Sequence, residues 1–138
     1  MAITSTTANK VLDYLFGSIA FSNLSTMYMG LSTTQIQPDG TGATEPSTST
    51  AYARMPIVNN KTNWGTASAA SLSNSTAITF PESTASWGTI TYVFLASSAT
   101  VGAADIWYFE ALSVPKTVQA STTVQFAIGA ITVSMTNA

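Results

Sequence analysis

One run of residues, Thr89–Leu95, constrains the fold more than any other part of the sequence. It consists almost entirely of β-branched and aromatic residues, a composition that favours a packed β-strand. Side chains alternate along a strand. The run therefore predicts one fully apolar or aromatic face, made up of Ile90, Tyr92 and Phe94. The opposite face becomes apolar only towards Leu95, so the strand is expected to enter at the rim of a sheet and to end inside it, with Trp87 covering the end of the core.

The only good helical pattern lies near the start of the chain. Apolar residues recur there at helical spacing, and they are Val11, Leu12, Leu15, Phe16 and Ile19. We expect Thr6 or Thr7 to cap the helix at its N-terminus and Gly17 to end it. A helix of about 9–12 residues is marginally stable alone. It is therefore expected to lie against the sheet or against a neighbouring subunit.

The rest of the chain predicts short strands between polar turns. The expected strands cover residues 26–32, 52–58, 77–80 and 105–112, followed by a hairpin of 123–128 with 131–135 about Gly129-Ala130. Pro56 cannot donate to a ladder, which places the strand 52–58 at an edge or bulge. The pattern predicts an all-β fold in one domain over residues 1–138, namely an antiparallel β sandwich of the jelly-roll type with one N-terminal α-helix.

The balance of charge excludes several functions. Only 7% of the residues are charged, against about 25% in a typical soluble protein. The net charge is −2, and the four basic residues are scattered along the chain, which removes the electrostatic basis of nucleic-acid binding. A neutral, hydroxyl-rich surface suits a subunit that packs against copies of itself or against a partner. We expect no membrane span and no signal peptide, hence synthesis in a cytoplasm.

The residues needed for catalysis are missing or badly spaced. The chain has no histidine and no cysteine, so the usual general base, zinc ligand and thiolate nucleophile are all absent. Asp105 and Glu110 share a predicted strand but stand an odd number of residues apart, and they should face opposite sides. We therefore predict no enzyme, no catalytic residue, no metal and no cofactor.

Two long polar stretches, Thr33–Thr50 and Asn59–Ser75, are predicted to be loops, and loops on a rigid sandwich commonly carry binding. Arg54, Lys61 and Trp64 lie in or next to them and are the predicted partner contacts. The alternative is that Arg54 solvates a strand edge and Trp64 covers the core. A set of large aromatics could instead stack on sugars if two or more of them were exposed together, and this set comprises Tyr52, Trp64, Trp87, Trp107 and Tyr108.

Several segments, taken in order, resemble a family of small virion proteins of tailed bacteriophages. They are Asn9–Asp13, Met27–Ser32, Tyr52–Arg54, Ile78–Pro81, Trp87–Thr91, Pro115–Val118 and Val124–Gly129. The chain also looks like the cementing protein of a short-tailed phage, a jelly-roll subunit on the outer surface of the capsid. That resemblance implies a decoration protein that binds the major capsid protein and stabilises contacts between its subunits, and we expect it to form a homodimer.

Two other functions remain open at this point. Relatives of such proteins are often labelled tail-fibre proteins, so the same fold could serve as a tail-fibre or baseplate component. A glycan-binding module is the third possibility. With so few charges, attachment of a cement protein to the capsid is expected to rest on apolar burial and backbone hydrogen bonds and to depend little on salt.

Overall fold

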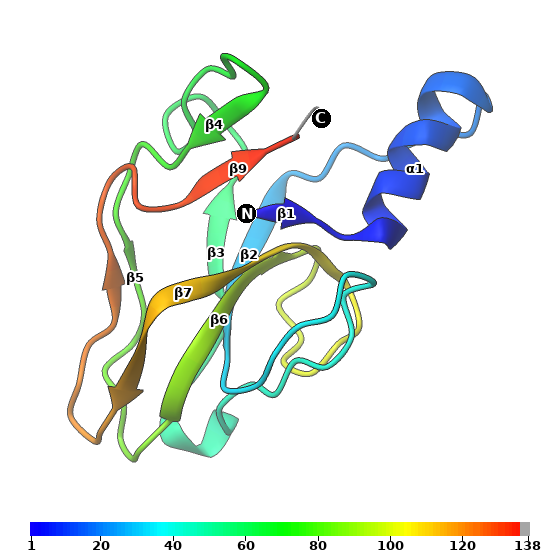
Figure 1. Cartoon of the computed structure of the whole chain (residues 1–138). Helices are drawn as coiled ribbons and strands as arrows, with labels where there is room; N and C mark the ends of the chain where they lie inside the picture. The colour runs from blue at the N-terminus through cyan, green and yellow to red at the C-terminus, as the bar shows by residue number, and fades with distance from the viewer. Residues whose placement is uncertain (136–138) are drawn as a thin grey trace.

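A computed structural model describes residues 1–135 of the chain (Figure 1). The elements in chain order are β1 (Ala2–Ile3), α1 (Ser5–Phe16), β2 (Thr26–Ser32), η1 (Thr48–Thr50), β3 (Met55–Val58), β4 (Ser71–Ser73), β5 (Ile78–Thr79), β6 (Gly88–Ala96), β7 (Ile106–Val118), β8 (Gln125–Phe126) and β9 (Thr132–Ser134). The prediction of a mostly β fold with one N-terminal helix is confirmed.

The strand predicted at Thr89–Leu95 is the middle strand of the main sheet. This sheet has five strands in the order β1-β7-β6-β2-β3, and all the pairs are antiparallel. β2 occupies residues 26–32 as predicted, and β3 is the edge strand on its side of the sheet, where Pro56 was expected. Trp87 is only 3% exposed, and its Nε1 donates to the carbonyl of Thr50 at 3.0 Å, so its indole does close the end of the core.

A β-bulge corrects the predicted faces of β6. The register against β7 shifts between Ile90 and Tyr92: these two residues are two apart, but their partners Lys116 and Ala111 are five apart. The extra residues therefore lie in β7, and the regular pairing is interrupted at this point. Ile90 packs in the same core cluster as Val93 and Leu95. Phe94 packs on the other side of the sheet. The prediction that Ile90 shares a face with Tyr92 and Phe94 is therefore wrong.

The predicted C-terminal hairpin is also wrong. β8 pairs with β5 and β9 pairs with β4, each as a two-stranded antiparallel sheet. Asn74, which is 2% exposed, separates them. Its side chain donates to the carbonyl of Ala127 at 3.0 Å and accepts from the backbone of Ile131 at 2.9 Å. Asn74 thus provides the hydrogen-bond partners of Ala127 and Ile131. The segments β8 and β9 therefore do not pair with each other, and each pairs with a different strand.

The core lies on both faces of the five-stranded sheet. On one face, the large apolar side chains of β2 and β6 pack towards β4, β5, β8 and β9. On the other, Ile36 from the long loop Thr33–Thr50 packs with Phe94 and Ile106. Antiparallel sheets are packed together, and no barrel closes within residues 1–135. This strand order does not show the jelly-roll part of the prediction.

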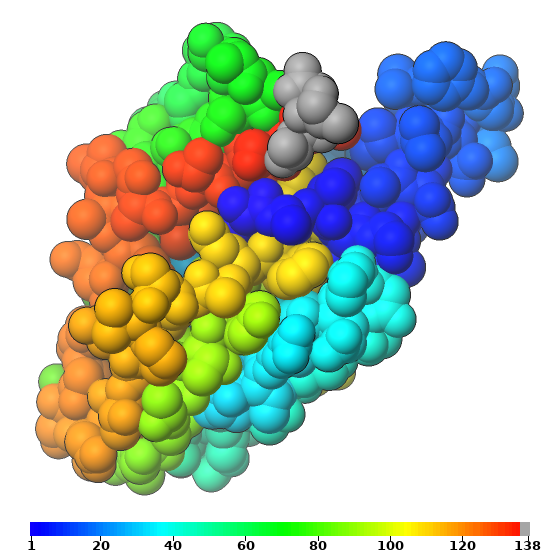
Figure 2. Space-filling view, viewed as in Figure 1, coloured from blue at the N-terminus to red at the C-terminus, as the bar shows by residue number. Residues whose placement is uncertain are grey.

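The helix begins two or three positions earlier than expected. Thr4, rather than Thr6 or Thr7, is the N-cap, and its Oγ1 accepts from the backbone of Thr7 at 3.4 Å. Gly17 ends the helix as predicted, with its N–H donating to the carbonyl of Asp13 at 2.8 Å. Thr7 is the only buried residue of α1, and Figure 2 shows the helix as a protrusion from the body of the molecule.

Candidate interaction surfaces

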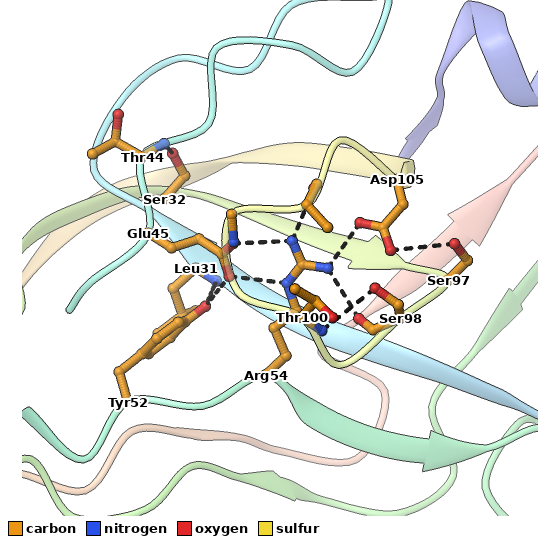
Figure 3. Close-up of polar contacts among 12 residues, drawn as sticks. Leu31, Ser32, Thr44, Glu45, Tyr52, Arg54, Ser97, Ser98, Thr100 and Asp105 are labelled. Atoms are coloured by element: carbon orange, nitrogen blue, oxygen red, sulfur yellow. Dashed lines mark hydrogen bonds and ion pairs between the residues drawn. The ribbon is translucent and has the colours of Figure 1, made fainter. Parts of the chain in front are cut away.

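The first candidate is a buried ion-pair cluster around Arg54, the only arginine of the chain (Figure 3). It combines Glu45 from the loop Thr33–Thr50, Tyr52 and Arg54 from the segment before β3, and Asp105 just before β7. The side chains of Arg54 and Glu45 are 1% and 4% exposed, and that of Asp105 is 19% exposed. We call these four residues the Arg54 cluster.

Every N–H of the Arg54 guanidinium donates within the chain. Nε and Nη2 donate to the two Glu45 oxygens at 3.1 and 3.0 Å, and Nη1 donates to Asp105 Oδ1 at 2.8 Å. The remaining two N–H groups reach the carbonyls of Ser98 and Ala103 at 3.0 and 3.1 Å. A guanidinium has five donors, so Arg54 keeps none for another molecule in this conformation.

Glu45 joins the cluster to the sheet. Its carboxylate also accepts from the Tyr52 hydroxyl at 2.8 Å and from the backbone of Gly102 at 2.6 Å. The Tyr52 oxygen in turn accepts from the N–H of Leu31, in β2, at 2.9 Å. The loop Thr33–Thr50 is thereby fixed to the sheet and to the loop before β7, although the sequence predicted it as a candidate binding loop.

The pKa values in the cluster follow from this arrangement. Burial, and then the negative charge of Glu45, raises the pKa of Tyr52 well above its usual value. Burial alone would lower the pKa of Arg54, but its hydrogen bonds to the Glu45 and Asp105 carboxylates, together with their negative charges, outweigh burial and raise the pKa. Tyr52 therefore stays neutral and Arg54 stays positively charged, so the cluster contains one cation and two carboxylates.

The second candidate is an apolar groove beside the helix. It has a volume of about 620 Å³ and lies between α1, β7 and the segment that joins β3 to β4, within the size range of about 300–1,000 Å³ usual for ligand clefts. Lys61 and Trp64 line it and Arg54 does not, so two of the three predicted contact residues come together here. Lys61 is the only charged residue of the lining within residues 1–135.

Three of the five aromatics considered for sugar stacking line this groove, namely Trp64, Trp107 and Tyr108. Trp64 is only 8% exposed, and its Nε1 donates to Asn59. The ring of Trp107 already packs against Phe21, at 5.3 Å between centroids, and lies under Lys10 Nζ at 5.7 Å. The groove thus offers aromatic walls, but Trp64 and Trp107 already pack against the protein's own residues.

The other two aromatics of that set are core residues. Tyr52 and Trp87 are 2% and 3% exposed, with their rings edge to face at 5.4 Å. Phe80 completes this aromatic group, at 6.2 Å from Tyr52 and 6.3 Å from Trp87. The predicted alternative, that large aromatics form the core, therefore holds for these two residues.

The third candidate is the apolar side of the helix. The exposed fractions of Leu12, Leu15, Phe16 and Ile19 are 53%, 62%, 83% and 59%. Ile19 lies just beyond the end of α1, and we call these four residues together the α1 face. The groove lies next to it, because Thr7 and Val11 of the same helix line the groove. Sequence reasoning found the apolar stripe from its spacing, but it had no means of identifying Phe21, Leu72 and Val133, which come from distant segments to line the groove.

The described residues contain no cluster of side chains suited to holding a metal ion. No group of three or more potential metal-binding side chains occurs among residues 1–135. Asp105 is engaged with Arg54, and Glu110 lies 3.8 Å from the N-terminal ammonium of Met1. Over the same part of the chain, no helix is long and apolar enough to cross a membrane.

A β body with exposed apolar surfaces suits a structural subunit, and comparison with protein families agrees. The family described as "Podophage GP4 fiber I protein gp80" (Gp80) matches residues 2–134. The chain belongs to this family. It is accordingly a structural protein of the virion of a short-tailed phage, of the fibre type. A search of curated proteins gave no match to this Gp80 chain.

Membership of Gp80 confirms the resemblance to phage virion proteins. It supports the tail-fibre alternative better than the capsid-cement function that the sequence suggested first. The cement role is not confirmed by any of these findings.

Proposed function

We propose that this Gp80 protein is a non-enzymatic subunit of a fibre on the virion of a short-tailed phage, and that it acts through contacts between proteins. The family match over residues 2–134 carries the proposal. Within the fibre, the β body serves as a rigid module, and the surface made of the α1 face and the groove attaches it to its neighbours.

The distribution of satisfied and unsatisfied groups supports this function. The described residues leave no buried side-chain nitrogen or oxygen without a hydrogen-bond partner, so the body needs no ligand to complete its interior. Large apolar side chains of the α1 face are exposed instead. Exposed apolar patches of this kind mark contact surfaces with other proteins.

Counting the protein in purified virions tests the proposal. Quantitative mass spectrometry, with the major capsid protein as the internal reference, should give a few to a few dozen copies per virion. Gold-labelled antibodies should bind fibres at the tail. Hundreds of copies spread over the capsid would overturn the fibre function and favour a cement protein that binds the major capsid protein.

A search for enzymatic activity provides the second test. The purified protein should leave host polysaccharide and peptidoglycan intact, as judged by size-exclusion chromatography of each polymer before and after incubation. Release of oligosaccharides that is lost when a carboxylate of this chain is replaced by its amide would contradict the non-enzymatic part of the proposal.

A further inference from the structure

The helix α1 lacks the packing that a helix of its length needs. Helices shorter than about 12–15 residues are marginal in water, and they are stabilised mainly by packing of their apolar face. α1 has 12 residues, and only Thr7 is buried. Leu12, Leu15 and Phe16 lie on one side of the helix, because successive residues are about 100° apart around its axis, and this side faces away from the body.

The exposed area is large for a single chain. A large aromatic side chain presents about 150–250 Å² when fully accessible, so the α1 face exposes on the order of 500 Å² at its observed fractions. A standard protein interface buries about 800 Å² on each partner. The α1 face together with the walls of the groove reaches this scale, whereas either alone falls short of it.

The groove and the α1 face complement each other. The face is convex and apolar, and the groove is concave, with walls that include Trp64, Leu72 and Val133. Among the described residues, the only charge in the lining is the cation Lys61. The last turn of α1 carries Asp13 and no basic residue, and it is also the negative end of the helix dipole. A helix of this sequence therefore meets an attractive charge in the groove.

We propose that α1 of one copy docks in the groove of a second copy of this chain, and that the second copy's α1 docks in return. The groove and the helix are neighbours on each chain. Two copies related by a two-fold axis beside α1 would therefore bury both surfaces of each chain in a single closed contact. The contact would give a dimer whose two helices lie side by side between two β bodies. This inference deepens the proposed function by naming the partner of that surface.

The first experiment measures the mass of the purified protein by light scattering and its dissociation constant by sedimentation. We expect a dimer at micromolar concentration. The double variant Leu15→Ser/Phe16→Ser should raise the dissociation constant at least about 100-fold, because two large apolar side chains lose their burial. The matched control is Val114→Ser/Ile128→Ser, which removes two side chains that are 59% and 68% exposed elsewhere on the surface and should leave the dimer unchanged.

A second experiment distinguishes helix-in-groove docking from pairing of two helices alone. The chain contains no cysteine, so engineered thiols report single contacts. Protein with Ser18→Cys, just after α1, is mixed with protein carrying Lys61→Cys in the groove and is oxidised gently. We expect the disulfide between the two different proteins to form faster than either protein pairs with itself. Faster self-pairing of Ser18→Cys would overturn the groove as the docking site.

Two further results would overturn the proposal. One is a monomer at 100-micromolar scale, where a dimer of this area should persist. The other is saturable binding of host polysaccharide by a monomer, abolished by Lys61→Glu, which would assign the groove to a glycan. All of these measurements use the isolated protein, so their failure is distinct from failure of the fibre function, which copy number and location in the virion decide.

Discussion

The Arg54 cluster and the surface formed by the α1 face and the groove differ in how completely a single chain provides contacts for their side chains. In the Arg54 cluster, five donors meet five acceptors and almost no side-chain surface reaches solvent. At the α1 face, apolar side chains are more than half exposed. A chain with only 7% charged residues thus uses three of its charges to fix its own loops and leaves apolar groups for contact. Charged groups thus make the protein rigid, and apolar groups provide the surface for attachment.

The largest expected effect comes from breaking the Arg54 cluster. Arg54→Ala leaves the carboxylates of Glu45 and Asp105 without their cation, and loss of one partner from a buried pair costs about 3–5 kcal/mol. Urea denaturation at equal protein concentration should show this loss in the free energy of unfolding. Lys61→Ala, which removes an exposed cation, should change stability by no more than about 0.5 kcal/mol. Equal costs for the two variants would show that the cluster is not essential to the fold.

A smaller loss is expected from Gly30→Ala in β2. Gly30 is paired with Phe94, and a methyl group at this position would overlap the Phe94 ring. That ring also lies 5.1 Å below the Arg54 guanidinium. Overpacking of this kind costs about 1–3 kcal/mol. Gly65→Ala is the matched control, because its added methyl group meets no atom closer than 3.7 Å; a comparable loss there would remove the steric explanation.

Alkaline pH is expected to weaken the protein through its buried tyrosines. Burial raises the pKa of Tyr52, with a further contribution from Glu45, and burial raises the pKa of Tyr108. Both therefore stay protonated when folded while the unfolded chain ionises near pH 10. Their contribution is complete below that pH and is lost above it, by up to about 1.4 kcal/mol per pH unit for Tyr52.

Denaturation series from pH 8 to pH 11 measure this loss. Tyr52→Phe should make the decline above pH 10 shallower, although the variant starts about 1–3 kcal/mol lower because the N–H of Leu31 loses its acceptor. An unchanged slope in this variant would show that Tyr52 is not the group responsible.

The smallest effect is expected from salt. Because the docking surfaces are almost uncharged, the dissociation constant of the dimer should change by less than about threefold between about 0.05 and 0.5 M sodium chloride. Lys61→Gln should raise it by no more than about fivefold, the cost of one exposed charge interaction. A collapse of the dimer over this range, with the protein still folded, would mean that ion pairs hold it.

Sequence reasoning succeeded where the signal was local. The spacing of Leu12, Leu15 and Phe16 predicts α1, and the composition of residues 26–32 predicts β2 with its observed bounds. It failed where the register or the pairing of strands changed. The bulge after Ile90 and the separation of β8 from β9 by Asn74 depend on hydrogen bonds between distant segments, and residue types alone do not encode them.

The interaction surfaces were predictable only in part. Lys61 and Trp64 both line one groove. Arg54 lies in the Arg54 cluster instead, and its role as a partner contact stays a prediction. Its partners Glu45 and Asp105 are 9 and 51 residues away, too far for any spacing rule. The one available signal was that a chain with four basic residues places its only arginine among the apolar residues that lead into a strand.

The bonds of Glu45 have a consequence for cleavage by proteases. Proteases cut exposed loop tips, and how often they do so depends on how often the loop opens. The loop Thr33–Thr50 is long, yet Ile36 is 1% exposed and Glu45 holds the loop to Arg54 and Gly102. Opening this loop means breaking buried ion pairs first. Proteases should therefore cut this loop less often than its length alone suggests.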